Sequence, residues 1–181
     1  LLTGVIFPKD GSIMINGEES RDRSPEMLSN IFYLSEDYVL PAISVKKYVS
    51  AYGPLYPRFD EDKFYTILND FEVDPAARLD RLSFGQKKKA MITFGIATRA
   101  KLLFLDEPTN GLDIPSKSQF RKVLLRGFED DQIIIISTHQ IRDLNNLIES
   151  VIIIEDGKIV FNQDVFEIQE KLIFTDARLS E

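Results

Sequence analysis

The alternation of short apolar runs with helical patterns in the second half of the chain constrains its fold most strongly. Three apolar runs predict strands, at Leu102–Leu105, Ile133–Ile136 and Val151–Ile154. The stretches between them, from Pro115 to about Phe128 and near Ile141–Ile148, predict helices, and proline is tolerated in a first helical turn. Near-continuous apolar strands separated by helices indicate a parallel sheet covered on both faces, so we expect an α/β fold.

The first hundred residues add two expected strands and a helical region. The strands are expected at Gly11–Gly17 and Asn30–Glu36, and helices are expected at Ser44–Tyr52, Asp60–Phe71 and Ser83–Ala97. We therefore expect one domain over residues 1–181, with a core at 1–40 and 100–161 and a helical subdomain at about 41–99. An Asp-Gly turn within Glu155–Lys158 predicts a hairpin, and a C-terminal helix is expected at about 164–172.

Composition excludes several classes of protein. The net charge of -7 argues against a general nucleic-acid binder, whose affinity comes from neutralising phosphates. The absence of cysteine excludes a disulfide framework and a cysteine-based zinc site. The longest apolar runs are far shorter than the roughly 18 residues of a membrane span.

Polar side chains follow three of the expected strands. Asp106 and Glu107 follow one strand, His139 comes soon after the second, and Glu36 ends the third. Because ligands of open parallel sheets sit beyond the carboxyl ends of the strands, we expect these side chains to converge on one site. Grouped carboxylates repel one another unless a cation intervenes, and Mg²⁺ shared with phosphate oxygens would do so. The alternative is a pair of solvated acids and a histidine that only caps or packs.

A second candidate site lies in the segment "RLSFGQKKK", Arg81 to Lys89. Ser83 and Gly85 stand at the start of an expected helix, and helix N-termini bind phosphate through free N–H groups and the helix dipole. The alternative is a simple N-cap that stabilises the helix by ~1 kcal/mol, with Lys87–Lys89 as a solvated face.

Together these motifs resemble the ATP-binding cassette (ABC) ATPases over about residues 1–161. The resembling segments are "LSFGQ" (Leu82–Gln86, the signature), "LLFLDEP" (Leu102–Pro108, the Walker B strand), "NGLD" (Asn110–Asp113, the D-loop), "STH" (Ser137–His139, the switch) and "EDGKIV" (Glu155–Val160, the late hairpin). The resemblance implies a P-loop NTPase-like parallel sheet core with a helical subdomain.

The resemblance also implies a role for each motif residue. Asp106 and Glu36 would hold the metal, Glu107 would act as general base on the attacking water, and His139 would contact the γ-phosphate. The residues implied in nucleotide binding across a subunit interface are Ser83, Phe84, Gly85, Gln86 and Asp113. ATP and Mg²⁺ are the implied cofactors.

The implied partners follow from the same family. They are a second ABC cassette, forming a homo- or heterodimer, and an integral membrane permease subunit that meets the segment Tyr38–Tyr56; no nucleic acid is expected. The implied location is cytoplasmic, at the inner face of the cell membrane. A soluble ABC ATPase that is not a transporter, and a nucleotide-incompetent dimerisation module, remain as alternatives.

The sequence departs from the family pattern in three places. It contains no G-x-x-x-x-G-K-[ST], the phosphate-binding Walker A loop, so we expect a chain truncated at its N-terminus and inactive alone. Glu36 replaces a glutamine usual in the family. Phe84 replaces the first signature glycine, where it either crowds the phosphate or points away from it.

Overall fold

The chain forms two compact units, residues 1–140 and residues 141–181, which are described separately. The computed structural model describes residues 2–144 and 147–171. The candidate site residues all belong to the first unit.

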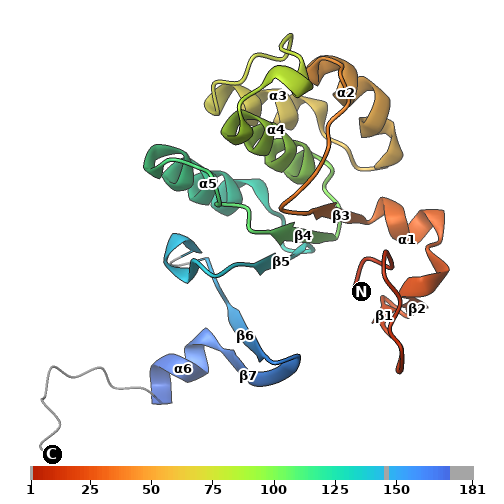
Figure 1. Ribbon diagram of the computed structural model, residues 1–181, viewed down its shortest axis with the longest axis vertical. Coiled ribbons are helices and arrows are strands. Elements are labelled where there is room, and N and C mark those ends of the chain that lie inside the picture. The colour runs from red at the N-terminus through yellow and green to blue at the C-terminus, as the bar shows by residue number, and fades with distance from the viewer. Residues whose placement is uncertain (1, 145–146, 172–181) are drawn as a thin grey trace, which may run out of the picture. The chain divides into compact units, whose positions relative to one another are not determined.

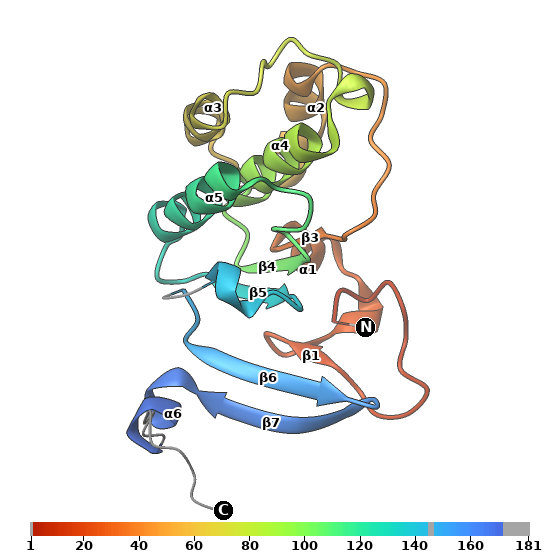
Figure 2. The same ribbon diagram turned by 60° about the vertical axis from the view of Figure 1, so that its left-hand side comes forward.

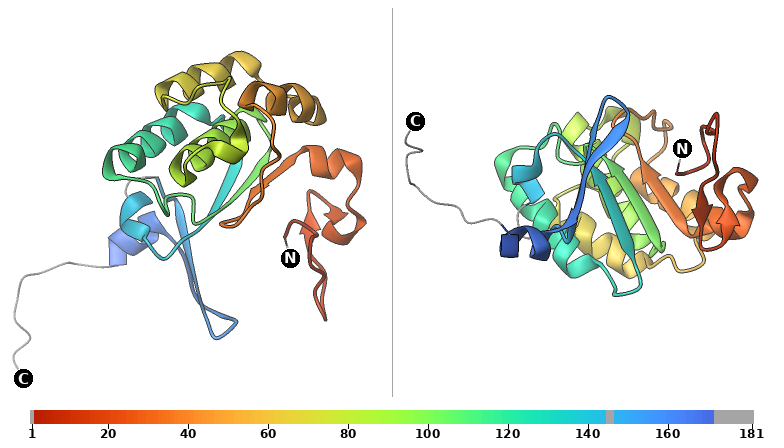
Figure 3. Two further views of the ribbon diagram at one scale, coloured as in Figure 1. Left: turned by 45° about the horizontal axis from the view of Figure 1, so that its top comes forward. Right: turned by 90° about the horizontal axis from the view of Figure 1, so that it is seen from below.

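A three-stranded parallel sheet forms the centre of the first unit. Its strands are β3 (Ile31–Leu34), β4 (Leu102–Asp106) and β5 (Ile133–Ser137), with β4 in the middle (Figure 3). In the register, Leu34 lies opposite Leu105, and Asp106 lies opposite Ser137. The predicted α/β class and parallel pairing are therefore confirmed, and the carboxyl ends of the three strands lie at one edge.

Helices cover one face of this sheet. The helices α4 (Phe84–Ala97) and α5 (Ile114–Gly127) lie over it (Figure 1), and the alternate residues Leu103 and Leu105 of β4 are buried. The approach between α4 and β3 is close: a Cβ on Gly95 would lie 2.4 Å from the Phe32 ring, so glycine is required there.

The opposite face of the sheet is covered only in part by the described residues of this unit. The helix α1 (Pro25–Ser29) places Met27 against Ile31 and Phe104 in a small buried cluster. Ile133 and Ile135 of β5 are 58% and 42% exposed. The expectation of a sheet covered on both faces is therefore wrong over β5.

The predicted helical subdomain is present, and its other helices lie above α4 in Figure 2. Its elements are α2 (Val45–Tyr52), the 3-10 helix η2 (Gly53–Leu55), α3 (Glu61–Asp70), the 3-10 helix η3 (Leu79–Arg81) and α4 itself. The predicted helices begin where expected because Ser44, Asp60 and Ser83 accept hydrogen bonds from main-chain N–H groups as N-caps. Phe94 of α4 is buried at the centre of an aromatic cluster with Phe32, Tyr48, Tyr56, Phe59 and Phe64.

The expected strand at Gly11–Gly17 is shorter in the structure. Only β1 (Met14–Ile15) forms, and it pairs antiparallel with β2 (Glu18–Glu19), before the 3-10 helix η1 (Ser20–Asp22). The strand stops because Asn16 and Gly17 both have positive φ, 51° and 86°, which makes a tight hairpin turn.

The second unit differs from the prediction in two respects. Where a helix was expected near Ile141–Ile148, the described residues form only the 3-10 helix η4 (Ile141–Leu144), and Asn145 and Asn146 lie outside them. The two asparagines have low helix propensity, which disfavours an α-helix here. The predicted strand at Val151–Ile154 exists as β6 (Ser150–Glu155), but among the described residues it pairs antiparallel with β7 (Lys158–Asp164) and not in the parallel sheet.

The remaining predictions for this unit agree with the structure. The turn between β6 and β7 contains Asp156 and Gly157, both with positive φ, so the predicted hairpin is confirmed. The C-terminal helix α6 spans Val165–Lys171, and the expected last residue, Leu172, lies outside the described residues.

Candidate functional site

The carboxyl edge of the parallel sheet collects the predicted acids and the histidine. Asp106 is the last residue of β4 and Glu107 follows it, while Glu36 comes two residues after β3. His139 comes two residues after β5. The structure brings Glu107 and His139 into direct contact, with Glu107 Oε1 2.7 Å from His139 Nδ1.

Glu107 is held at several points. Its main chain has a φ of 45°, a left-handed conformation that non-glycine residues rarely adopt, and its N–H donates to the carbonyl of Ser137 at 2.9 Å. Its carboxylate accepts hydrogen bonds from the Thr138 hydroxyl at 3.0 Å and from the His139 main-chain N–H at 2.9 Å. The side chain is only 16% exposed. Burial raises the pKa of this carboxyl, but the hydrogen bonds from His139 and Thr138 outweigh burial and hold the pKa below its usual value.

His139 does not have the buried environment of a packing residue. Its side chain is 68% exposed while its Nδ1 contacts Glu107. Gln140 lies beside the imidazole, with its Nε2 3.2 Å from His139 Nε2, and the Gln140 main-chain N–H donates to the Thr138 hydroxyl at 3.0 Å. The imidazole is therefore oriented by the carboxylate while remaining open to a ligand.

The other two acids make separate contacts. Asp106 accepts a hydrogen bond from the Ser137 hydroxyl at 2.5 Å, and Glu36 accepts one from the Asn110 amide at 2.6 Å. Among the described residues, no group of three or more acidic, histidine or cysteine side chains is arranged to hold a metal. Mg²⁺ commonly takes one or two carboxylates and completes its shell with phosphate oxygens and water, so the residues fit a metal that is shared with a phosphate ligand.

Lys88 is a site residue that was not predicted from the sequence. Its side chain is fully buried, and its Nζ donates to the carbonyl oxygen of Glu107 at 2.7 Å. Burial lowers the pKa of Lys88, and the charges of four acids oppose that effect: Glu36, Glu107, Asp106 and Asp37. The alternative of Lys87–Lys89 as a solvated face therefore does not hold at Lys88, whose side chain is buried. The signal was helical spacing, because Lys88 stands four residues before the buried Ile92 on the same face of α4.

The first turn of α4 carries the predicted phosphate-binding residues. Ser83 and Gln86 form a capping box, in which each side chain accepts the main-chain N–H of the other, at 3.2 Å and 3.1 Å. A Cβ on Gly85 would meet only ordinary contacts, the nearest being the Gly111 carbonyl oxygen at 3.6 Å. Packing within the described chain therefore does not require glycine at this position, whereas the close approach of a ligand would.

Phe84 lies against its own chain. A Cβ on Gly111 would fall 2.4 Å from the Phe84 ring, and Lys88 Nζ lies 5.2 Å from the ring centroid. The ring is 50% exposed and fills the space between the Asn110–Asp113 turn and α4. The Phe84 ring is thus directed at Gly111 of its own chain.

Asp113 has a local role in the fold. It is the N-cap of α5, and its carboxylate accepts the Ser116 main-chain N–H at 2.9 Å. This hydrogen bond lowers the pKa of Asp113. Its neighbour Asn110 binds Glu36, so the turn between β4 and α5 is tied to the end of β3.

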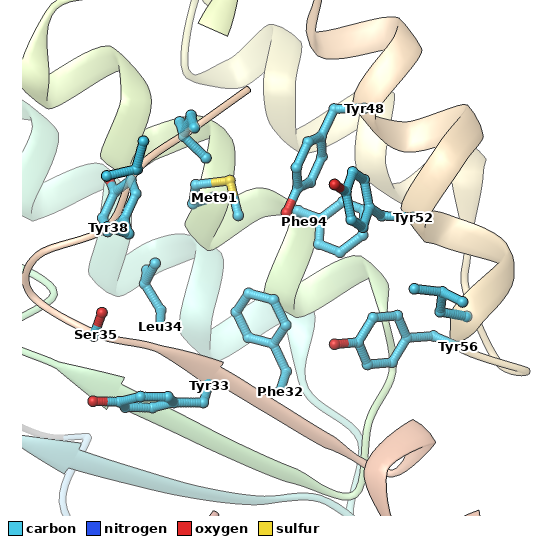
Figure 4. A pocket seen from close by; sticks show the side chains of 13 residues that line it. Phe32, Tyr33, Leu34, Ser35, Tyr38, Tyr48, Tyr52, Tyr56, Met91 and Phe94 are labelled. Atoms are coloured by element: carbon cyan, nitrogen blue, oxygen red, sulfur yellow. The ribbon is translucent and has the colours of Figure 1, made fainter. Parts of the chain in front are cut away.

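A separate aromatic pocket opens between β3 and the helical subdomain (Figure 4). It has a volume of about 260 Å³, and its lining includes Tyr38, Val39, Tyr48, Tyr52 and Tyr56. The Tyr48 and Tyr52 rings are stacked with centroids 4.4 Å apart. The Tyr38 hydroxyl is buried and has no hydrogen-bond partner among the described residues. Burial raises the pKa of Tyr38, and it raises that of Tyr48 to about 12, so both hydroxyls are neutral at physiological pH.

A parallel sheet with acids and a histidine at its carboxyl edge, beside a capped helix start, is an arrangement in which α/β proteins bind ligands. The family model described as "ABC transporter" matches residues 1–110. The chain belongs to this family and corresponds to its ATP-binding subunits, as the motifs predicted. No helix in the described part of the chain is long and apolar enough to cross a membrane.

Individual relatives agree with this assignment. The chain is 26% identical over 175 residues to the ABC transporter ATP-binding protein YtrB of Bacillus subtilis, covering 96% of this chain and 60% of that protein. It is 29% identical over 170 residues to SkfE of the same organism, an ATP-binding protein of SkfA peptide export, covering 91% of this chain and 70% of that protein. The chain thus spans less than two thirds of the length of YtrB.

A solved structure supports the fold. A structure described as the ATP binding subunit of an ABC transporter superposes with a TM-score of 0.79 at 21% identity, covering 93% of this chain and 73% of that chain. This likeness shows the P-loop NTPase-like fold that the motifs predicted.

Proposed function

We propose that the protein containing this chain hydrolyses ATP, with Glu107 as the general base. The observation that carries the proposal is the Glu107 carboxylate, ionised and oriented by Thr138 and His139 next to Asp106. A carboxylate so placed takes a proton from an attacking water, which contributes about 10²–10⁴-fold to a rate. His139, exposed and in contact with Glu107, would contact the γ-phosphate.

Asp106 is the proposed metal residue, with Glu36 at the margin of the site. When bound, Mg²⁺ would neutralise phosphate charge. Asp106 would orient its ligands through the carboxylate that Ser137 holds. Glu36 is hydrogen-bonded to Asn110, which lies on the turn between β4 and α5. Its proposed effect on the metal is therefore indirect, through the position of this turn.

The working unit is proposed to be a pair of cassettes. The open first turn of α4, with Ser83 and Gly85, would bind the γ-phosphate of ATP held by the second cassette, with Phe84 folded aside and Gln86 keeping the turn capped. Asp113 lies at the start of α5 on the turn that would face that partner. The 181 residues contain no G-x-x-x-x-G-K-[ST], so we propose that by themselves they hold ATP weakly.

The second proposed partner is a membrane permease. The aromatic pocket of Figure 4 provides a groove with the almost fully exposed Val39 and with a buried Tyr38 hydroxyl that has no hydrogen-bond partner in residues 2–144 and 147–171. An inserted polypeptide segment would bury this apolar surface and supply a hydrogen bond to Tyr38. This feature favours a transport ATPase at the inner face of the cell membrane over an ABC ATPase that does not act on membranes.

Substitution of the proposed base tests the ATPase function. In the protein produced from the full reading frame, Glu107→Gln should reduce ATP turnover at least about 100-fold and should accumulate an ATP-bound dimer on gel filtration. Glu26→Gln, an exposed substitution on α1, should leave both unchanged. Wild-type protein without turnover would refute the ATPase proposal, and unchanged turnover in Glu107→Gln would refute the assignment of the base.

A further inference from the structure

Lys88 is the one charged residue that is buried among the described residues of the chain. An ammonium group is costly to remove from water unless it is paired and hydrogen-bonded. A methionine would fill the same volume without that cost, so packing alone does not explain a lysine here. The explanation has to lie in what the Nζ atom contacts.

The contact is with the main chain of the proposed base. Lys88 Nζ donates to the Glu107 carbonyl oxygen at 2.7 Å, while the Glu107 N–H donates to the Ser137 carbonyl at 2.9 Å. Glu107 is in the left-handed conformation, which a non-glycine residue keeps only when its surroundings fix it. Ser137 fixes it on one side, and Lys88 fixes it on the other together with Asn110, whose N–H donates to the Glu107 carbonyl at 3.2 Å. This main-chain direction aims the carboxylate at Thr138 and His139.

The charge of Lys88 is also matched to its surroundings. The acids that face it are Glu36, Asp37, Asp106 and Glu107. The Phe84 ring covers it, with 5.2 Å between Nζ and the ring centroid, a distance at which a cation is attracted to an aromatic face. Lys88 thus places a basic side chain among the acids at the carboxyl edge of the sheet.

We propose that Lys88 is a positioning residue that holds the main chain of Glu107 and thereby ties the catalytic edge to the signature helix. This inference rests on the proposed ATPase function. Lys88 lies on α4 only about 6 Å along the helix axis from the Phe84 turn. A ligand bound at the first turn of α4 therefore acts on the base of the same chain through one rigid helix.

Two substitutions of Lys88 and one control test the proposal in the protein from the full reading frame. Lys88→Met removes the donor and the charge but keeps the volume, and Lys87→Met is the matched control on the neighbouring, partly exposed lysine. Lys88→Met should lower kcat for ATP about 10- to 100-fold, because small misplacements of a catalytic group have effects of that size. The KM for ATP should change less than twofold, and Lys87→Met should change neither constant. Lys88→Gln, smaller and polar, replaces the methionine variant if that protein does not fold.

Two further measurements separate positioning from general damage to the structure. In the Glu107→Gln background, adding Lys88→Met should leave the ATP-trapped dimer intact, since the base is already absent. The imidazole signal of His139, the single histidine of these 181 residues, should shift in the proton NMR spectrum of Lys88→Met and not of Lys87→Met. This signal is independent of turnover, so a protein without ATPase activity would refute the proposed function while still testing the contact.

Opposite results would overturn the proposal. They are a kcat within twofold of wild type in Lys88→Met, loss of the trapped dimer in the double variant, or an unchanged His139 signal.

Discussion

Alanine at Gly111 tests the position of the Phe84 ring, which decides whether the start of α4 is open. Gly111 has a φ of +76°, and an added Cβ would fall 2.4 Å from the ring. Gly111→Ala therefore has two costs, the strain of a left-handed alanine and the displacement of the ring.

The magnitude of each cost can be worked from the structure. A left-handed alanine costs about 1–2 kcal/mol. Full burial of a phenylalanine stabilises by about 1.5–3 kcal/mol, and the Phe84 ring is 50% exposed, so displacing it costs about 1 kcal/mol. We expect Gly111→Ala to lower the free energy of unfolding by about 2–3 kcal/mol in wild type. In a Phe84→Ala background the cost should fall to about 1–2 kcal/mol, because only the strain remains.

The assay is urea denaturation of the four proteins of this double-mutant cycle, followed by circular dichroism. Gly17→Ala is the matched control, because Gly17 also has positive φ, +86°, and a Cβ there would meet nothing within 4 Å. Its cost should be the same with and without Phe84. Distant sites add within about 0.3–0.5 kcal/mol, so a Gly111→Ala cost that differs by less than this between the two backgrounds would refute the placement of the ring.

Two further substitutions test the packing and the charges of the first unit. Phe94→Ala, at the centre of the aromatic cluster, should destabilise by about 3–5 kcal/mol in the same urea assay, whereas the exposed Phe7→Ala should stay within about 0.5 kcal/mol; equal effects would contradict the cluster. Hydrogen bonds from Arg99 lower the pKa of Glu129, so its stabilisation is full above the ordinary carboxyl pKa and is lost as the pH falls through the lowered value. Glu129→Gln should accordingly lower the melting temperature at pH 7, with the difference from wild type disappearing in acid and shrinking in 1 M salt; a difference that persists in acid would exclude this ion pair as its cause.

The sequence predicted those parts of the site that depend on local pattern. Apolar strands such as Leu102–Leu105 define a parallel sheet, and the residue after each strand must lie at the carboxyl edge, so the meeting of Glu107 with His139 follows from strand order alone. The N-cap Ser83 was also predicted correctly at a helix start, because a cap is a contact across three residues. The cap formed by Asp113 was not predicted.

The sequence did not predict the features that depend on which way a helix face is turned or on which sheet a strand joins. Lys88 belongs to a run of three lysines, and only the helical phase relative to Ile92 turns it inward, onto a carbonyl 19 residues away. The strand β6 is apolar like β4, so the sequence predicted it in the parallel sheet, whereas among the described residues it pairs only with β7, in the hairpin that the Asp-Gly turn predicted. The acid cluster was interpreted as a site for a cation, and the sequence did not indicate that Lys88 also lies among these acids.

The partly uncovered face of the sheet has a consequence for the behaviour of the chain in solution. Four consecutive isoleucines, Ile133–Ile136, form most of β5, which is an edge strand of the three-stranded sheet. Uncharged β-branched edge strands are templates for self-association. Of the three acids shortly before β5, Asp130 is exposed, and its charge acts as a gatekeeper that repels a second copy, whereas Glu129 and Asp131 form ion pairs with Arg58 and Arg99. That protection is electrostatic, so it weakens at high ionic strength and in mild acid, and the colloidal stability of purified protein should be lowest under those conditions.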